Sequence, residues 1–112
     1  MSETQDSQKK TWAVRSGDAP GLILMDGEID FSVTPKVREA LLQLVGDSPR
    51  DIVLDLSGLD YIDSSGLALL LELRRQLVDT GRSVRIRAIT SQVRKLFNLT
   101  QLGDLFDLPE QG

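Results

Sequence analysis

Short apolar segments of strand length alternate along this chain with longer segments of helical periodicity. Residues 52–56 form a nearly continuous apolar run, typical of a central strand that is covered on both faces. An amphipathic helix is predicted before this run, at residues 34–46, and a second helix follows it at residues 63–80. Two strands joined through a helix pair in parallel with a right-handed crossover. The alternation therefore predicts an α/β fold.

Further strand signals complete the order of elements. Residues 12–15 and 22–25 are predicted to pair as a hairpin, because the segment between them is rich in turn-forming residues. Residues 84–88 alternate apolar side chains with arginines, which indicates a strand with one solvated face. Residues 105–108 are predicted to form a last edge strand. The order is ββαβαβα(β), a small mixed sheet of four to five strands with three to four helices packed against it.

The predicted helices carry end signals. Thr34 before Pro35 marks the start of the first helix, with the Thr34 hydroxyl expected to cap it, and Gly46 marks its end. Thr90 is expected to cap a third helix. The first turns of the second helix, residues 67–71, are apolar on all sides, which predicts that this end of the helix is buried.

The domain organisation is simple. Residues 1–10 are polar and are expected to form a disordered tail, residues 11–108 a single domain, and residues 109–112 a polar end. Residues 47–49 are expected to turn the chain after the first helix. The 112-residue length suffices for one core without disulfides.

Composition excludes several classes of function. The chain has no Cys and no His, so Cys-based metal sites, Ser-His-Asp triads and His general bases are ruled out, and no cofactor or enzymatic activity is expected. A net charge of −4 has the wrong sign for general nucleic-acid binding. Because no apolar window approaches the length of a membrane span, no membrane insertion is expected, and a cytoplasmic location is the simplest expectation.

A run of polar residues that could be modified or could bind a partner lies between the central strand and the second helix, at residues 60–66. Two serines at a helix N-terminus stand beside free backbone N–H groups, which would stabilise a phosphate on either hydroxyl. Gly66 is expected to let another chain approach closely. The simpler alternative is that Asp63 or Ser64 only caps the helix, which contributes about 1 kcal/mol.

Three segments of the sequence resemble one known family. They are residues 27–30 (Gly-Glu-Ile-Asp), residues 52–59 and residues 61–68, the last containing Asp-Ser-Ser-Gly. Together they resemble the STAS domain, and the subgroup they resemble most is the bacterial anti-sigma factor antagonists. The resemblance extends over about residues 12–108.

The resemblance implies a partner-switching cycle that regulates transcription. An unphosphorylated antagonist binds an anti-sigma factor that is also a GHKL-type serine kinase, and is released once the kinase phosphorylates it. A PP2C-type phosphatase restores the unphosphorylated form. The family pattern places the phosphate on Ser65, makes Ser64 the structural capping serine, and brings Asp30 close to the site; Asp30 could equally cap the following turn. The implied partner-binding residues are Asp30, Asp63, Ser64, Ser65, Gly66 and Leu67.

Two alternatives remain open from the sequence. A cytoplasmic STAS subunit of a bacterial phospholipid-transport ABC complex has a similar motif; its hydroxyl residue corresponds to Ser64, and its partner is an ATPase subunit. A receiver-like site would instead use Asp55 or Asp60 with Mg²⁺. That site needs clustered carboxylates and usually a lysine on a later strand, where this chain has Arg85 and Arg87.

Overall fold

The computed structural model describes residues 11–46 and 50–110 of the chain. The predicted tail at residues 1–10, the turn at residues 47–49 and the last two residues of the polar end lie outside the described residues. The elements in chain order are β1 (Trp12–Ser16), β2 (Leu22–Ile29), α2 (Thr34–Val45), β3 (Ile52–Ile62), α3 (Ser64–Asp79), β4 (Val84–Ile89), α4 (Ser91–Leu99) and the 3₁₀ helix η1 (Gly103–Phe106).

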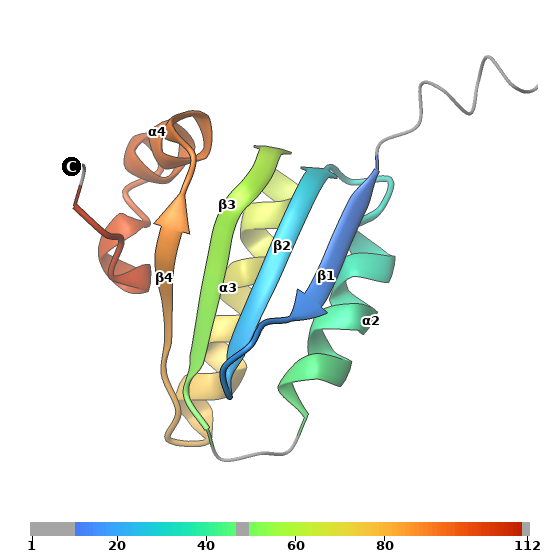
Figure 1. Cartoon of the computed structure of the whole chain (residues 1–112). Coiled ribbons are helices and arrows are strands. Elements are labelled where there is room, and N and C mark those ends of the chain that lie inside the picture. Colours follow the sequence, from blue (N-terminus) through green and yellow to red (C-terminus); the bar gives the residue numbers. More distant parts are fainter. Residues whose placement is uncertain (1–10, 47–49, 111–112) are drawn as a thin grey trace, which may run out of the picture.

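The sheet has the mixed pairing that the sequence predicts. Its four strands lie in the order β1-β2-β3-β4 (Figure 1). The pair β1 and β2 is antiparallel, whereas β2 with β3 and β3 with β4 are parallel. Leu54 in β3 stands beside Ile23 on one side and Ile86 on the other, and all three side chains are buried. The centre of the core therefore lies across these three strands.

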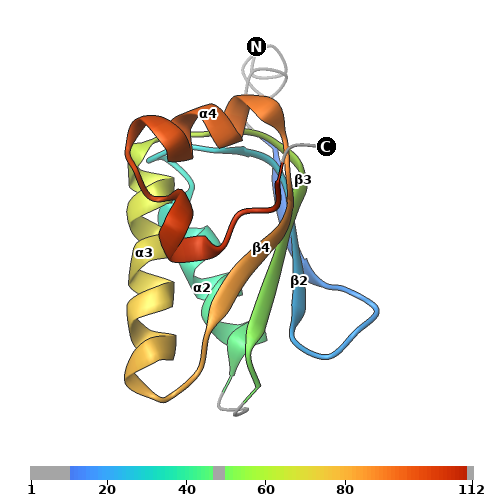
Figure 2. The ribbon, with the colours of Figure 1, turned by 90° about the vertical axis from the view of Figure 1, so that its left-hand side faces the viewer.

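One face of the sheet carries the helices. Figure 2 shows α2 and α3 on the same side of the sheet, with η1 beside β4 on that side. Both crossovers, from β2 to β3 and from β3 to β4, step across the sheet in the same direction, so right-handed connections place both helices on one face. The prediction that residues 52–56 are covered on both faces is therefore wrong.

Charged side chains occupy the other face. Asp55 lies between the buried Leu54 and Leu56 and points away from them, toward the uncovered face. Its Oδ2 accepts a hydrogen bond from Arg87 Nε at 3.0 Å. Arg15 Nη2 and Asp26 Oδ2 form a second ion pair on this face, also at 3.0 Å. The run at residues 52–56 can therefore include one charged residue, because the buried Asp55 carboxylate pairs with Arg87 and accepts hydrogen bonds from Ser57.

The predicted last strand at residues 105–108 is also wrong, since this segment contains the end of the 3₁₀ helix Gly103–Phe106. Phe106 is fully buried and packs edge-to-face on Phe97 of α4, with ring centroids 5.6 Å apart. Asp107 then has a left-handed backbone, with φ of 50°, which interrupts any extended strand. The described part of the chain accordingly has four strands and three α-helices.

Both central strands are longer than predicted. β2 continues through Gly27 and Glu28 to Ile29, and β3 continues for 11 residues to Ile62. The two strands end in register, with Ile29 beside Ile62 and both side chains buried. The residues that follow these strands are therefore held next to each other at one end of the sheet.

Two of the three predicted helix end signals are confirmed. The Thr90 hydroxyl accepts from Val93 N at 3.3 Å and caps α4, and Gly46 ends α2 with φ of 56°. The N-cap of α2 is Val33, however, and makes no side-chain capping bond. Thr34 is already helical, and its hydroxyl donates to the Phe31 carbonyl instead. No helix within residues 11–46 and 50–110 is long and apolar enough to cross a membrane.

Candidate partner-binding and phosphorylation site

The residues singled out from the sequence meet at the carboxyl ends of β2 and β3, at the top of the sheet in Figure 1. The Asp63 N–H donates to the Ile29 carbonyl at 3.1 Å, which ties the start of α3 to the end of β2. Asp30 and Phe31 follow Ile29 directly. Two segments more than 30 residues apart in sequence thus form one surface around the start of α3.

The Asp63 carboxylate joins these two segments. Its Oδ1 accepts hydrogen bonds from Ser65 N at 3.0 Å, Ser65 Oγ at 2.6 Å and Gly66 N at 3.1 Å. Its Oδ2 accepts from Phe31 N at 3.0 Å. Asp63 is therefore the N-cap of α3, and the expectation that Ser64 is the capping serine is wrong. Ser64 is the first helical residue and is exposed.

These hydrogen bonds control the charge of Asp63. Partial burial raises the pKa of the Asp63 carboxyl, but hydrogen bonds from the Ser65 hydroxyl and from the backbone of Gly66, Phe31 and Ser65 outweigh it. The net result is a pKa below the usual value for an aspartate. Asp63 is consequently a carboxylate at neutral pH, placed against the Ser65 hydroxyl.

The same contacts correct one expectation about phosphate binding. The N–H groups of Ser65 and Gly66, expected to be free, already donate to Asp63. A phosphate on Ser65 Oγ would have to displace the Ser65 hydroxyl bond and compete with the Asp63 carboxylate for these donors. The start of α3 therefore tolerates a neutral hydroxyl better than a phosphate.

Gly66 and Leu67 are both buried. A Cβ at position 66 would lie 2.4 Å from Ile62 Cγ1 and 3.3 Å from Ile29 Cγ2. Gly66 thus lets α3 approach the ends of the chain's own β2 and β3, where close approach of another chain was expected. Contact of Gly66 or Leu67 with a partner stays a prediction.

Asp30 has a local structural role, which agrees with the interpretation that it caps the following turn. Its Oδ1 accepts hydrogen bonds from the backbone and the hydroxyl of Ser32, and its carbonyl accepts from Val33 N and Thr34 N. Asp30 therefore shapes the turn before α2. It lies next to Phe31, which Asp63 holds, so the two acidic residues do share one surface.

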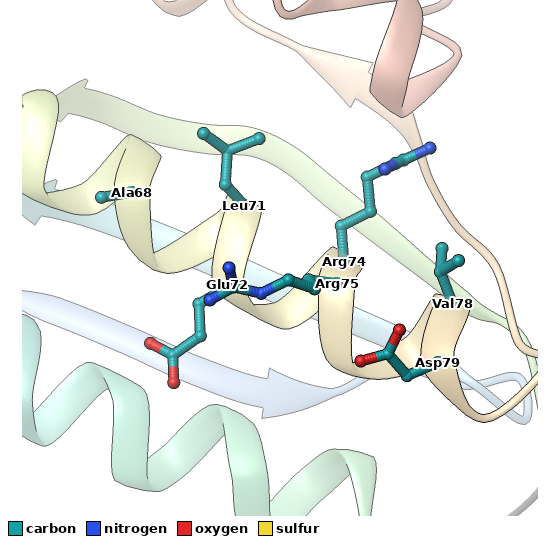
Figure 3. A pocket seen from close by; sticks show the side chains of 7 residues that line it. All are labelled: Ala68, Leu71, Glu72, Arg74, Arg75, Val78 and Asp79. Carbon is teal, nitrogen blue, oxygen red and sulfur yellow. The ribbon is translucent and has the colours of Figure 1, made fainter.

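The first turns of α3 are only partly buried. Leu67, Leu69 and Leu70 lie in the core, whereas Ala68 is exposed and Leu71 is half-buried. Figure 3 shows Ala68 and Leu71 on the outer side of α3. The prediction of a fully buried helix start is wrong because no element covers this side of α3 in the described part of the chain.

Sequence reasoning missed the large apolar side chains around the site. Leu99 is 80% exposed, Phe31 75% and Tyr61 47%. Leu99 and Tyr61 line one groove, together with Asp63 and Ser64. The one available signal was the position of Leu99 on α4, two residues after Phe97 and therefore off the buried stripe that Val93 and Phe97 form.

The receiver-like alternative gains no support from the geometry. Asp55 accepts hydrogen bonds from Ser57 and Arg87, and these lower its pKa below the usual value although burial raises it. Asp60 lies five residues further along β3, roughly 16 Å away at the rise of a strand. Among the described residues, no three acidic side chains gather as a metal site would require.

Comparisons with known proteins agree on one family. A family model described as the STAS domain matches residues 12–111. An anti-sigma-B factor antagonist of Staphylococcus aureus is 30% identical over 88 residues, which are 79% of this chain and 82% of that protein.

Solved structures extend the likeness to three dimensions. An anti-sigma factor antagonist from Mycobacterium paratuberculosis has a TM-score of 0.75 at 27% identity, covering 90% of this chain and 87% of that one. The anti-sigma factor antagonist SpoIIAA, in its unphosphorylated form, has a TM-score of 0.69 at 20% identity, with 91% and 89% covered, and this likeness is one of fold alone. The chain belongs to the STAS domain family, among the anti-sigma factor antagonists.

Proposed function

We propose that this protein is an antagonist that binds an anti-sigma factor of the GHKL serine-kinase type and is released when that kinase phosphorylates Ser65. A PP2C-type phosphatase would reverse the modification. The observation that carries the proposal is the Ser65 hydroxyl, presented at the start of α3 within 2.6 Å of the Asp63 carboxylate. The names of the relatives described above support an anti-sigma factor as the partner, and the kinase type and the phosphatase are part of the proposal.

The geometry supports an electrostatic switch. The surface around Ser65 carries Asp30 and Asp63 before modification, and phosphorylation adds close to two further negative charges. A partner that packs against a neutral hydroxyl would then bury an uncompensated charge, which costs about 2–5 kcal/mol. Such a loss weakens binding by on the order of 10²- to 10³-fold or more. The fold itself need not change.

The first test locates the phosphate. We would incubate the chain with ATP and each purified GHKL-type kinase of the source organism, then map modified residues by mass spectrometry. Ser65 should be the acceptor, the Ser65→Ala variant should stay unmodified, and the matched Ser64→Ala variant should be modified normally. Phosphate on Ser64 alone, or an acid-labile acyl phosphate on an aspartate, would overturn the assignment.

The second test measures the switch. The Ser65→Ala variant should bind the kinase constitutively, whereas Ser65→Asp should bind at least tenfold more weakly because it places a permanent charge beside Asp63. Isothermal titration calorimetry gives both dissociation constants. Equal affinities of the two variants would contradict the electrostatic mechanism. Binding of a transporter ATPase subunit in place of any kinase would instead favour the lipid-transport alternative.

A further inference from the structure

The end of the sheet that carries Ser65 also carries exposed apolar surface that no described element covers. The two most exposed large apolar side chains among the described residues are Leu99 and Phe31. The backbone of Phe31 donates to Asp63, and Leu99 lines the same groove as Asp63. Exposed apolar residues scattered singly are normal, but a group beside one site indicates an interaction surface.

A groove runs from this site to α4. It has a volume of about 440 Å³ and lies between the end of β3 with the start of α3 on one side and α4 on the other. Tyr61 and Ser64 line the first side, and Lys95, Leu96 and Leu99 line the second. A smaller hollow of about 340 Å³ adjoins it, lined by Lys95, Asn98 and Leu99. Leu99 therefore forms a ridge between two hollows.

The sequence of α4 explains why this groove is apolar. Val93 and Phe97 are four residues apart and face the core, where both are buried. Lys95, Leu96 and Leu99 follow a different face of the same helix, and the Lys95 stem adds apolar surface below its charged end. On this face Leu96 is half-buried and packs against the core, whereas Lys95 and Leu99 are exposed, so the outer part of the face is left uncovered in the described part of the chain.

We propose that this groove is a second part of the anti-sigma factor interface and receives a large apolar side chain from that partner. The inference rests on the proposed function. The groove is continuous with the proposed site, since Asp63 and Ser64 belong to both. An anchor in the groove would hold the kinase while its active site reaches Ser65. It would also give affinity that does not depend on the Ser65 hydroxyl, since Ser65 does not line the groove.

The test compares two exposed apolar residues that receive the same substitution. Leu99→Gln removes the ridge of the groove, and Val78→Gln is its matched control at the far end of α3, about 20 Å along the helix from Ser65. Both are made in the Ser65→Ala background, so the kinase cannot modify the chain during the titration. The probe is the GHKL-type kinase that binds the wild-type chain.

Leu99→Gln should raise the dissociation constant about tenfold or more, and Val78→Gln should leave it within twofold. Both variants should keep the wild-type urea midpoint, because both positions are exposed. Wild-type affinity in Leu99→Gln would overturn the groove and leave the proposed function intact. An equal loss in Val78→Gln would place the interface along α3 and also overturn the groove.

Two further outcomes contradict the proposal in different ways. If no kinase binds even the wild-type chain, the proposed function fails and the inference fails with it. If ultracentrifugation shows a dimer that Leu99→Gln dissociates, the occupant of the groove is a second copy of this chain. In the second case the Ser65 tests remain valid, so the two failures are distinguishable.

Discussion

The Asp63 carboxylate offers the sharpest test of how this end of the domain is held together. Replacing it by alanine removes the acceptor for three backbone N–H groups and the Ser65 hydroxyl. Loss of the N-cap costs about 1 kcal/mol. Loss of the Phe31 N–H bond adds roughly 1 kcal/mol or less, because that bond is exposed and water can replace the carboxylate. We expect Asp63→Ala to lower the free energy of unfolding by about 2 kcal/mol.

Asp63→Asn separates these two contributions. Asparagine is a good N-cap and can still accept from Ser65 and Gly66, but its amide nitrogen cannot accept from Phe31 N. The loss should therefore be about 1 kcal/mol, half that of the alanine variant. Asp60→Asn, at a nearby exposed acidic residue, is the control and should stay within 0.5 kcal/mol of wild type.

Urea denaturation followed by the fluorescence of Trp12, the only tryptophan, measures these differences, because Trp12 packs against the core. In thermal melts the alanine variant should lose roughly 8 °C. An alanine variant within 0.5 kcal/mol of wild type would refute the view that Asp63 joins the two segments. An asparagine variant as unstable as the alanine variant would show that the capping bonds contribute little.

Three other predictions follow from the same contacts. Gly66→Ala should lower the stability by about 1–3 kcal/mol, measured by urea denaturation, because its Cβ would overlap Ile62; unchanged stability would contradict this packing. Stability should be constant above about pH 5 and fall as the pH drops below about 4, because Asp55 and Asp63 have lowered pKa values when folded and both take up protons on unfolding there. This fall, followed by urea midpoints between pH 3 and 7, should be smaller in Asp63→Asn. The pure chain should hydrolyse no ATP in a phosphate-release assay, because it lacks His, Cys and a P-loop lysine motif; turnover that survives repurification would contradict this.

The topology could be predicted because the sequence contains its causes. A helix between two strands requires a crossover, and the crossover determines both the parallel pairing and its handedness. Gly46 and Thr90 act through local backbone geometry, so their roles are readable from residue type alone. The Asp-Ser-Ser-Gly motif likewise located the start of α3.

Features that depend on distant contacts could not be predicted. The polar residues Ser57 and Asp60 interrupt the apolar pattern, so the second half of β3 could not be recognised as a strand from the sequence. Pairing with β2 holds this half in the sheet, and its polar side chains can lie on the uncovered face. Residues 105–108 have a strand-like pattern, but the burial of Phe106 against Phe97 decides their conformation.

The sequence indicated that Asp30, Asp63 and Ser65 lie close together, which the structure confirms, but it missed the contacts that each of them makes. Asp63 and Ser64 are both good capping residues, and only the backbone shows that Asp63 has the extended conformation of an N-cap. The position of Leu99 off the buried stripe of α4 indicates an exposed side chain, but the groove beside it depends on where α4 lies relative to β3, which no local pattern contains. The groove was therefore invisible in the sequence.

The sequential strand order also determines how the domain can assemble. Each strand after β1 pairs with the strand made just before it, so the sheet can grow in the order of synthesis, and its pairings are short in sequence separation. The hydrophobic core nevertheless stays open at β4 until Phe106 packs on Phe97. The core is thus complete only once Phe106, the last buried residue in the described part of the chain, is in place. A chain that stops before Phe106 would expose the ring of Phe97 to water.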